Sequence, residues 1–385
     1  MIIKSKIFDN HQDSWIEINN GKIISINNKP EFQRVNNTLK LEIENSFAFP
    51  GLINSHDHLE FSLFPKLGNK KYQDYVEWGD DIHKNNIEVI NRILRIPIKL
   101  RVEYGIYKNA LNGVTTVVHH GEKFSIPSSL IDIYDNYNYL HSIGLHKNWK
   151  LKLNLPFNSL PFVIHIGEGV NNETYLEADE LIKWNLFNRT LIGIHGITVN
   201  EKQAGNFKAL VWCPVSNYFL YGMTAQIDKL KNVTTILFGT DSNVSSDWNI
   251  WENIRFARKL ELLNDIELYN SLTSNAVQIW NLHDKGLLLP GFKADLVITR
   301  KKEGKDIFDS LYKTNPEDIL LILKDGIIIQ FDQSLKKQLE VKINISDYTE
   351  IEMNGEVKFV KGRLEKLCKE IRSYHPDIKF PFNYY

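Results

Sequence analysis

Two histidines separated by one residue, His56 and His58, follow an apolar run in the stretch FPGLINSHDHLEFSLFP, residues 49–65. On a β-strand, side chains two residues apart point to the same face, so the two imidazoles project together while Asp57 points the other way. The pair could therefore ligate a metal ion. Taken alone, two such histidines are more often hydrogen-bonded surface or core residues.

Other apolar runs also end in residues that bind metals. His165 closes the run in VIHIGEG, His195 closes IGIHG, where Gly196 follows it, and Asp241 follows LFGT. Because the carboxyl ends of parallel strands meet at one face of a barrel, residues this far apart in sequence can converge. Imidazole nitrogens and a carboxylate oxygen suit zinc or another borderline divalent ion, with one position left open for water. We therefore expect three histidines and an aspartate to hold one ion.

An ion of this kind would make a hydrolytic site. A bound divalent cation lowers the pKa of a coordinated water from ~15.7 to about 7, so that hydroxide is available as a nucleophile at neutral pH. Glu168 lies three residues after His165, just beyond the expected end of the strand. From there its carboxylate could accept the proton of the water and deliver it to a substrate. The alternative for Glu168 is a solvated loop carboxylate, and for His195 a hydrogen-bonded core residue.

Composition restricts the classes of protein that could carry this site. The chain has 385 residues, of which 43% are hydrophobic, enough for one large domain and a smaller one. Lys and Arg (46) balance Asp and Glu (47) and are scattered, so no nucleic-acid partner is expected. No apolar run reaches the ~18 residues of a membrane span. Cys213 and Cys368 lie far apart, which fits a reducing compartment, and we expect a cytoplasmic protein.

The pattern along the chain predicts a mixed α/β architecture. WIEINNGKIISI, residues 15–26, contains Asn-Gly between two β-type runs, which predicts a hairpin. Short apolar runs then alternate with helix-compatible segments, as expected for a parallel sheet covered by helices: GVTTVVHH, PFVIHIG, TLIGIHG, ALVWCP and TTILFGTDS. After Asn281, short strands return in ADLVITRK and DGIIIQFD.

From this pattern we predict a TIM-like (β/α) barrel with a small β-sandwich domain built from both termini. The barrel is expected over residues 48–283, and the small domain over residues 1–47 and 284–345. Residues 346–385 should form a C-terminal helix and tail that pack on the body. The predicted helix lies in VKGRLEKLCKEIRS, because apolar residues recur there at helical spacing: Val360, Leu364, Leu367 and Ile371.

The motifs GLINSHDH, HIGE, IHG, CPVSN and GTDS, followed by GLLLPGFKADLVI, resemble in their order the metal-dependent amidohydrolase superfamily. The resemblance covers about residues 16–332. It is greatest to the aminohydrolase branch, which includes triazine hydrolases, guanine deaminase and S-adenosylhomocysteine/methylthioadenosine deaminases. It implies one divalent metal ion, with zinc expected and iron or manganese as alternatives, held by His56, His58, His165 and Asp241. It also implies that Glu168 shuttles protons, that His195 contacts the substrate or the attacking hydroxide, and that Asp241 orients this hydroxide.

The chain departs from the family pattern in three places. Between His120 and Pro161 there is room for about one clear strand, around YLHSIGLH, where the family normally has two, so we expect an abbreviated or distorted barrel. No lysine stands out as a carbamylated bridge, which favours a single-metal site. The loop FPKLGNKKYQDYVEWGDDIHK, residues 64–84, lacks the pattern of a nucleoside deaminase and leaves the substrate open.

Several other residues are candidates for substrate contact, each with a structural alternative. By strand alternation, either His119 or His120 should face the mouth of the barrel, although packing is the more frequent role. Ser216 and Asn217 in CPVSN resemble a family loop near the pocket, but a turn that ends the strand explains them equally well. Trp78, with Tyr72 and Tyr75, could stack on a planar substrate, whereas such residues more often pack in the core or in a lid.

Three functions are compatible with these residues. The leading hypothesis is a metal-dependent hydrolase whose hydroxide attacks an amidine-like or amide carbon and releases ammonia from an amino-substituted heterocycle. A second hypothesis is a cyclic amidohydrolase, or another C–N hydrolase, that uses the same site. A third, from a different class, is a catalytically silent scaffold stabilised by metal. The expected partner is a small-molecule substrate rather than nucleic acid or membrane, and a homo-oligomer is compatible with the sequence.

Overall fold

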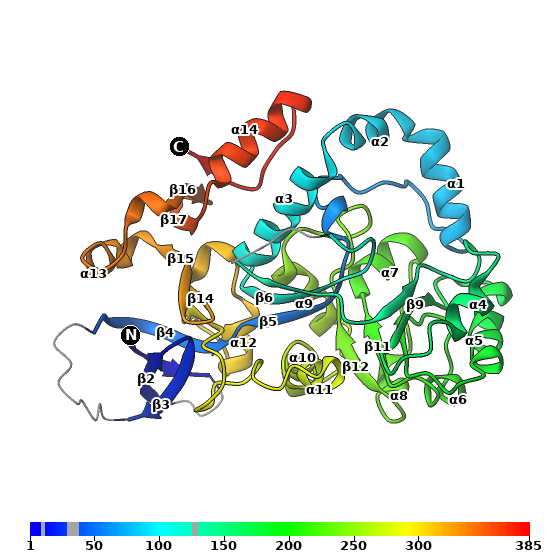
Figure 1. Ribbon diagram of the computed structural model, residues 1–385, viewed down its shortest axis with the longest axis horizontal. Helices are drawn as coiled ribbons and strands as arrows, with labels where there is room; N and C mark the ends of the chain where they lie inside the picture. Colours follow the sequence, from blue (N-terminus) through cyan, green and yellow to red (C-terminus); the bar gives the residue numbers. More distant parts are fainter. Residues whose placement is uncertain (9–11, 29–37, 125–129) are drawn as a thin grey trace.

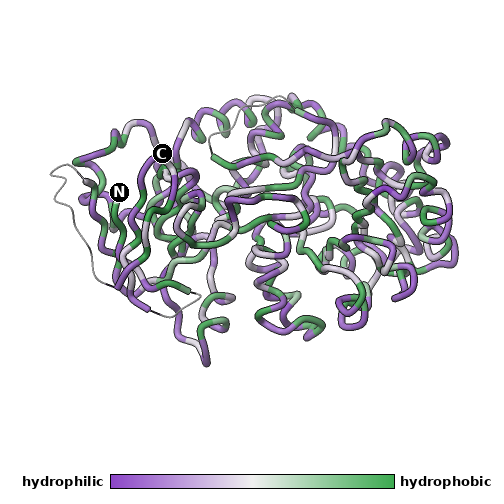
Figure 2. The backbone as a smooth tube through the Cα atoms, turned by 60° about the horizontal axis from the view of Figure 1, so that its bottom comes forward, coloured by the Kyte–Doolittle hydropathy of each residue, from purple (hydrophilic) through white to green (hydrophobic). Residues whose placement is uncertain are grey.

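Strands from both ends of the chain share one sheet in the computed structural model, which describes residues 1–8, 12–28, 38–124 and 130–385. The sheet has ten strands in the order β18-β16-β17-β15-β14-β13-β4-β1-β2-β3. Both termini lie at the end of the molecule formed by this sheet (Figure 1, Figure 2). Its strands are β1 Ile2–Ile7, β2 Asp13–Asn19, β3 Lys22–Asn27, β4 Lys40–Pro50, β13 Leu296–Arg300, β14 Ile319–Lys324, β15 Ile327–Asp332, β16 Tyr348–Met353, β17 Glu356–Lys361 and β18 Asn383–Tyr384.

The predicted Asn-Gly hairpin is confirmed. β2 and β3 pair antiparallel, and the turn between them places Asn20 and Gly21 at φ +48° and +76°. Two consecutive residues with positive φ are what a two-residue type I′ hairpin needs, and Asn and Gly are the residues that adopt this conformation at least cost.

Parallel strands form two further sheets that carry the polar strand ends. The five-stranded sheet has the order β12-β11-β10-β9-β8, and the three-stranded sheet has the order β5-β6-β7. Each of the five predicted apolar runs is one of these strands. Their bounds are β5 Leu52–Asp57, β6 Val114–His119, β7 Asp132–Tyr134, β8 Asn138–Leu140, β9 Phe162–Ile166, β10 Leu191–His195, β11 Ala209–Trp212 and β12 Thr235–Phe238.

In the described part of the segment between His120 and Pro161, two three-residue strands replace the single clear strand expected. β7 pairs with β6 and β8 pairs with β9, and only residues 135–137 separate β7 from β8. One short stretch of chain therefore supplies an edge strand to each parallel sheet, without a helix between the two strands.

The opposite edges of the two sheets are joined just beyond the end of β12. The backbone N–H of Asp241 donates to the carbonyl of His56 at 3.0 Å. The Asn54 side chain donates to Thr240 Oγ1 at 2.8 Å and accepts from the Thr240 N–H at 3.1 Å. This seam brings the end of β12 beside the end of β5.

Helices cover the parallel strands, while α1 and α2 extend away from them (Figure 1). Side-chain caps mark several starts: Asp74 accepts from two backbone N–H groups of α1, and Asn171 accepts from one of α5. The helices are α1 Tyr75–Asn85, α2 Ile87–Leu94, α3 Ile98–Leu111, α4 Trp149–Asn154, α5 Asn172–Trp184, α6 Glu201–Ala204, α7 Pro214–Tyr221, α8 Ile227–Leu230, α9 Ile250–Lys259, α10 Asp265–Ser271, α11 Ser274–Trp280, α12 Ile307–Tyr312, α13 Lys336–Leu339 and α14 Leu364–Tyr374. No helix in the described ranges is long and apolar enough to cross a bilayer.

The C-terminal helix is shorter than the predicted pattern. α14 begins at Leu364, whereas Val360 belongs to β17. Gly362 lies between them at φ +97°, a conformation that ends the strand and cannot continue as a helix. The apolar periodicity therefore runs from a strand into a helix. Val360 is buried as a residue of β17, whereas Leu364 is buried as a residue of α14.

The ten-stranded sheet separates two apolar clusters. Along β4, Phe47 and Phe49 pack into the large cluster that includes α3 and the parallel strands, while Ala48 packs into a second cluster with Ile3 and Leu296. This alternation is the period of two expected of a strand buried on both faces. After β4, the chain passes through Gly51 into β5, and a Cβ at Gly51 would lie 2.3 Å from Thr115. Glycine is required for this close approach.

Candidate active site

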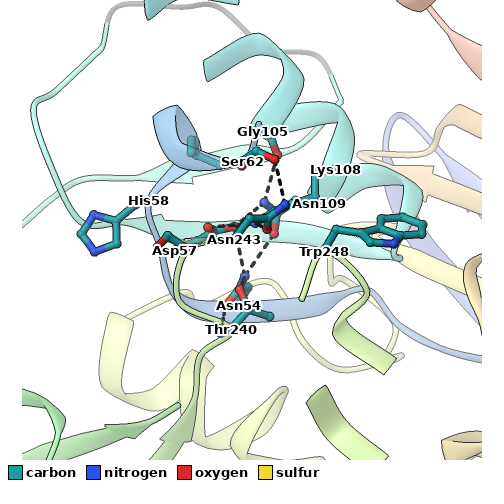
Figure 3. A network of polar contacts seen from close by, with 12 residues as sticks. Asn54, Asp57, His58, Ser62, Gly105, Lys108, Asn109, Thr240, Asn243 and Trp248 are labelled. Carbon is teal, nitrogen blue, oxygen red and sulfur yellow. Dashed lines mark hydrogen bonds and ion pairs between the residues drawn. The ribbon is translucent and has the colours of Figure 1, made fainter. Parts of the chain in front are cut away.

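The paired histidines lie at the carboxyl end of β5, and both are buried. Their rings lie 4.9 Å apart, centroid to centroid, and His58 projects away from Asp57 (Figure 3). The alternation of strand side chains thus places the two imidazoles on one side and the Asp57 carboxylate on the other.

Asp57 is held on its own side by a buried network. Lys108 Nζ on α3 lies 2.8 Å from Asp57 Oδ2, and Asn109 Nδ2 donates to the same oxygen at 2.8 Å (Figure 3). Asn54 connects this group to the seam, because its Nδ2 also donates to Asn109 Oδ1 at 3.1 Å. Asp57 is completely buried and Lys108 nearly so. The network fixes the backbone between the two histidines.

His165 and Asp241 meet the paired histidines from the five-stranded sheet. His165 Nε2 lies 3.3 Å from His56 Nε2, and Asp241 Oδ1 lies 3.5 Å from His56 Nε2 and 3.8 Å from His58 Nε2. Two ligand atoms bound tetrahedrally at about 2.1 Å from an ion are about 3.4 Å apart. The spacing and the three-imidazole, one-carboxylate donor set therefore fit a zinc-sized divalent ion.

Outer contacts orient two of these ligands. His165 Nδ1 donates to the His141 carbonyl at 2.8 Å, which leaves Nε2 free for an ion. Asp241 Oδ2 accepts from Ser216 Oγ at 2.6 Å and from Ser245 Oγ at 3.0 Å, so that Oδ1 faces the histidines. Ser216 therefore contacts a metal-ligand candidate.

Burial sets the protonation of the site. It lowers the pKa of His56, and it lowers the pKa of His58 and His165 well below the usual range of histidine. Neutral imidazole is the form that binds metal. Burial acts to raise the pKa of Asp241, but the hydrogen bond with the His56 ring outweighs it and holds this pKa well below its ordinary value. The site thus presents neutral imidazoles and an ionised carboxylate.

Two residues at the strand ends adopt unusual backbone conformations. His195 has φ +70° and Asp241 has φ +60°. For residues other than glycine this left-handed region is strained, at a cost of order 1–3 kcal/mol each, and such strain concentrates at functional sites. The conformation turns both side chains toward the histidine cluster immediately after their strands end.

Glu168 lies in the loop after β9 and is almost fully buried. Tyr221 Oη donates to Glu168 Oε1 at 3.0 Å, and His195 Nε2 lies 3.7 Å from the same oxygen. Burial raises the pKa of Glu168, with a smaller opposing effect from His195. A carboxyl with a raised pKa can both accept and release a proton near neutral pH.

His195 is fixed by a chain of buried hydrogen bonds. Its Nδ1 lies 2.8 Å from Asn217 Oδ1, Asn217 Nδ2 donates to Thr224 Oγ1 at 3.0 Å, and Trp212 Nε1 donates to the same hydroxyl at 2.7 Å. Because the Asn217 oxygen can only accept, His195 carries its proton on Nδ1 and turns Nε2 toward Glu168. Asn217 and Tyr221 are four residues apart on α7 and share one helix face.

His119 and His120 face different surroundings. His119 Nδ1 accepts from the Leu59 N–H at 3.4 Å, and its Nε2 donates to the Glu122 carbonyl at 3.0 Å. The ring of His120 lies 4.6 Å from that of His165, centroid to centroid, and neither of its nitrogens has a hydrogen-bond partner within the described part of the chain. Of the two, His120 is the residue at the cluster.

The aromatic residues of the segment 64–84, expected as a loop, use their polar atoms within the protein, and two of them, Tyr75 and Trp78, lie on α1. Trp78 Nε1 donates to the Leu67 carbonyl at 2.9 Å, Tyr72 Oη donates to Asp81 at 2.7 Å, and Tyr75 Oη donates to Glu177 Oε1 at 2.6 Å. Tyr72 is buried and Trp78 packs against the apolar clusters. These contacts are those of residues that hold α1 in place.

His141 is a residue of the site that the sequence pattern did not indicate. Its ring stacks on His165 at 4.4 Å, and its nitrogens group with those of His58 and His165 within 4.8 Å. It follows β8, which has only three residues and no long apolar run before it. Its position two residues after Tyr139, at a strand end like the other histidines, is the signal that could have identified it.

A protein-family model and curated relatives match this chain. The model of the amidohydrolase family matches residues 163–358. A 5-methylthioadenosine/S-adenosylhomocysteine deaminase of Caldicellulosiruptor saccharolyticus is 24% identical to this chain over an alignment of 383 positions. The alignment covers 83% of this chain and 89% of that protein.

Solved structures share the fold at low sequence identity. An adenosine deaminase from Xanthomonas campestris with bound zinc has a TM-score of 0.71 at 14% identity and covers 98% of each chain. An atrazine chlorohydrolase from Arthrobacter aurescens in complex with zinc has a TM-score of 0.67 at 14% identity and covers 97% of this chain and 99% of that chain. With the family match over half of its length, this chain belongs to the amidohydrolase family.

Proposed function

We propose that the protein is a zinc-dependent hydrolytic deaminase that releases ammonia from an amino-substituted nitrogen heterocycle. The observation that carries the proposal is the position of Glu168: a buried carboxyl, held by Tyr221 and 3.7 Å from His195. It lies at the histidine cluster in which His56, His58, His165 and Asp241 are the candidate ligands of a divalent ion. A metal-stabilised scaffold has no use for a buried proton carrier at this place. Deaminase relatives and zinc-containing structural neighbours support the same reading.

In this proposal His56, His58, His165 and Asp241 would hold the ion, which when bound would supply Lewis acidity and let water ionise near neutral pH. The Glu168 carboxyl takes a proton from the attacking water and returns it to the departing amino group. His195 faces the reacting carbon with Nε2, in the tautomer that Asn217 fixes. Asp241, with Oδ2 bound by two serines, orients Oδ1 toward the attacking water.

The arrangement of the parallel strands supports a proposal for the architecture. We propose that the parallel strands form an abbreviated (β/α) barrel over residues 48–283, closed at the seam between β12 and β5, with the β7–β8 stretch replacing a complete strand–helix unit. Residues 1–47 and 284–345 would form the β-domain. Residues 346–385, expected as a helix and tail, add β16, β17 and β18 to its sheet, and α14 packs on the body. A cytoplasmic location remains our expectation.

Ammonia release together with metal content tests the proposed function. Purified protein loaded with zinc should hold one ion per chain and release ammonia from at least one member of a panel of amino-substituted pyrimidines, purines and triazines. His58→Ala should lose both the ion and the activity, because it removes one of four ligands. His83→Ala, which changes an exposed histidine on α1, should retain both. Ammonia release that persists in His58→Ala would contradict the proposal.

Asn217 supplies a prediction about the His195 tautomer. Asn217→Leu removes the acceptor for the His195 Nδ1–H, and we expect turnover to fall by about 10- to 100-fold with metal content unchanged, as for other contacts that orient site histidines. Asn217→Asp keeps an acceptor and should restore most of the turnover, with the pH profile displaced because a carboxylate favours imidazolium. Steady-state rates across pH measure both effects. Equal losses in the two variants would show that Asn217 only fills space.

A further inference from the structure

A cavity of about 620 Å³ opens beside His58, between the loop after β6, the turn that follows β5 and the β8–α4 region. Aromatic and aliphatic side chains, among them Phe61, Tyr139 and Leu140, form much of its lining. Such walls suit a planar ring. Because His58 is part of the lining, a ring that enters the cavity lies beside one ligand of the proposed metal site.

Glu60 places a carboxylate in this lining. It lies in the turn Leu59–Phe61, two residues after His58, and is only 9% exposed. Its Oε2 is buried, without a hydrogen-bond partner in the described part of the protein. An unpaired buried carboxylate oxygen is costly unless a donor reaches it.

The neighbours of Glu60 do not supply this donor. His119 Nδ1 is 3.8 Å from Oε2, but this nitrogen accepts from the Leu59 N–H, while the other ring nitrogen donates to Glu122. Arg101 Nη1 donates instead to the backbone carbonyl of Glu60 at 2.9 Å. The fold thus positions the Glu60 carboxylate while its Oε2 receives no hydrogen bond from the described residues.

His120 is a second buried polar group in the lining of the cavity. It is 1% exposed, its ring lies 5.4 Å from Tyr139, centroid to centroid, and both ring nitrogens lack a partner among the described residues. Two unpaired polar side chains in the lining that also contains His58 indicate that a polar ligand completes this part of the cavity.

We infer that this cavity is the substrate pocket and that Glu60 selects heterocycles carrying, besides the amino group that is hydrolysed, an amidine-type edge with adjacent N–H donors. A carboxylate is an acceptor with two oxygens, and paired N–H groups match it with two charge-assisted hydrogen bonds. A ring without these donors leaves the buried carboxylate unpaired and is rejected. The inference rests on the proposed function, whose substrate class it narrows.

Binding without turnover tests the role of Glu60. Zinc-loaded Glu168→Gln protein is titrated in a calorimeter, in mildly alkaline buffer, with isocytosine and with the pyrimidinone that lacks its amino group. The single amino group of isocytosine belongs to the amidine edge, so this probe tests recognition of the edge by Glu60 and carries no second amino group for hydrolysis. We expect isocytosine to bind at least about tenfold more tightly, the effect of one charge-assisted hydrogen bond. Adding Glu60→Gln should reduce the ratio of the two dissociation constants to less than about threefold, since the charge and one acceptor are lost.

Glu122→Gln is the matched control, because Glu122 lines the same cavity but is exposed. It should leave the ratio unchanged, and zinc content should be the same in all variants. Equal affinity for the two probes, no binding of either, or a ratio that survives Glu60→Gln would overturn the inference.

The two proposals fail separately. A protein that prefers isocytosine through Glu60 but, with Glu168 intact, releases no ammonia from any heterocycle would contradict the proposed function alone. If the protein is a deaminase but Glu60→Gln does not change the ratio of its affinities for isocytosine and the pyrimidinone, only the assignment of Glu60 is contradicted.

Discussion

Glu168→Gln should lower turnover by about 10²- to 10⁴-fold, the contribution of a positioned acid–base group, while the metal content stays at one ion per chain. Glutamine keeps the size of the side chain, and its oxygen can still accept from Tyr221 Oη. It cannot take up and release a proton at the pH of the reaction. Ammonia release and metal analysis on the same preparation measure the two effects.

Glu177→Gln is a closely matched control. Glu177 accepts from Tyr75 Oη at 2.6 Å as Glu168 accepts from Tyr221, and burial raises its pKa to about 7. It lies on α5, where its partner belongs to α1 rather than to the histidine cluster. Turnover in Glu177→Gln should therefore remain near that of the unsubstituted protein. A near-normal rate in Glu168→Gln would remove the central element of the mechanism.

The second large effect concerns stability. Lys108→Met removes the cation beside Asp57, whose carboxylate is fully buried and 2.8 Å from Lys108 Nζ (Figure 3). We expect the free energy of unfolding, measured by urea denaturation of the metal-free protein, to fall by about 3–5 kcal/mol, because an uncompensated charge is left in the interior. This is a large part of the roughly 5–15 kcal/mol that stabilises a typical domain.

A double variant separates the effect of losing the Lys108–Asp57 ion pair from the effect of leaving the Asp57 carboxylate uncompensated in the interior. In Asp57→Asn with Lys108→Met, the new amide oxygen can still accept from Asn109 Nδ2, and most of the lost stability should return. Lys84→Met, an exposed lysine on α1, should change the free energy of unfolding by less than about 0.5 kcal/mol. If Lys108→Met behaved like Lys84→Met, the ion pair would have no energetic role.

Residues at the ends of long apolar strands could be anticipated from the sequence. His56, His58, His165 and Asp241 follow such runs, so strand periodicity predicts where they lie without knowledge of their neighbours. His195 follows the same rule. The hairpin at Asn20–Gly21 could be predicted because its conformation is dictated locally by two residue types.

Residues that depend on tertiary packing could not be anticipated. Tyr221 reaches Glu168 only because α7 packs beside the loop after β9, and no local pattern distinguishes it from other tyrosines. Lys108 belongs to α3, whose nearly uniform burial removes the amphipathic signal that would mark an inward-facing cation. Asn217 shows a further difficulty. Its motif indicates that it lies near the site, but not that its amide oxygen accepts the hydrogen bond of His195 Nδ1.

The seam between the parallel sheets has a thermodynamic consequence. His56 and His58 come from one sheet, and His165 and Asp241 come from the strands of the other, so an ion held by all four cross-links sheets that otherwise meet there through few hydrogen bonds. A ligand that binds only the closed seam stabilises it by mass action, by about 4 kcal/mol at a thousand times its dissociation constant. Metal depletion should then loosen this seam locally before it affects the remainder of the fold.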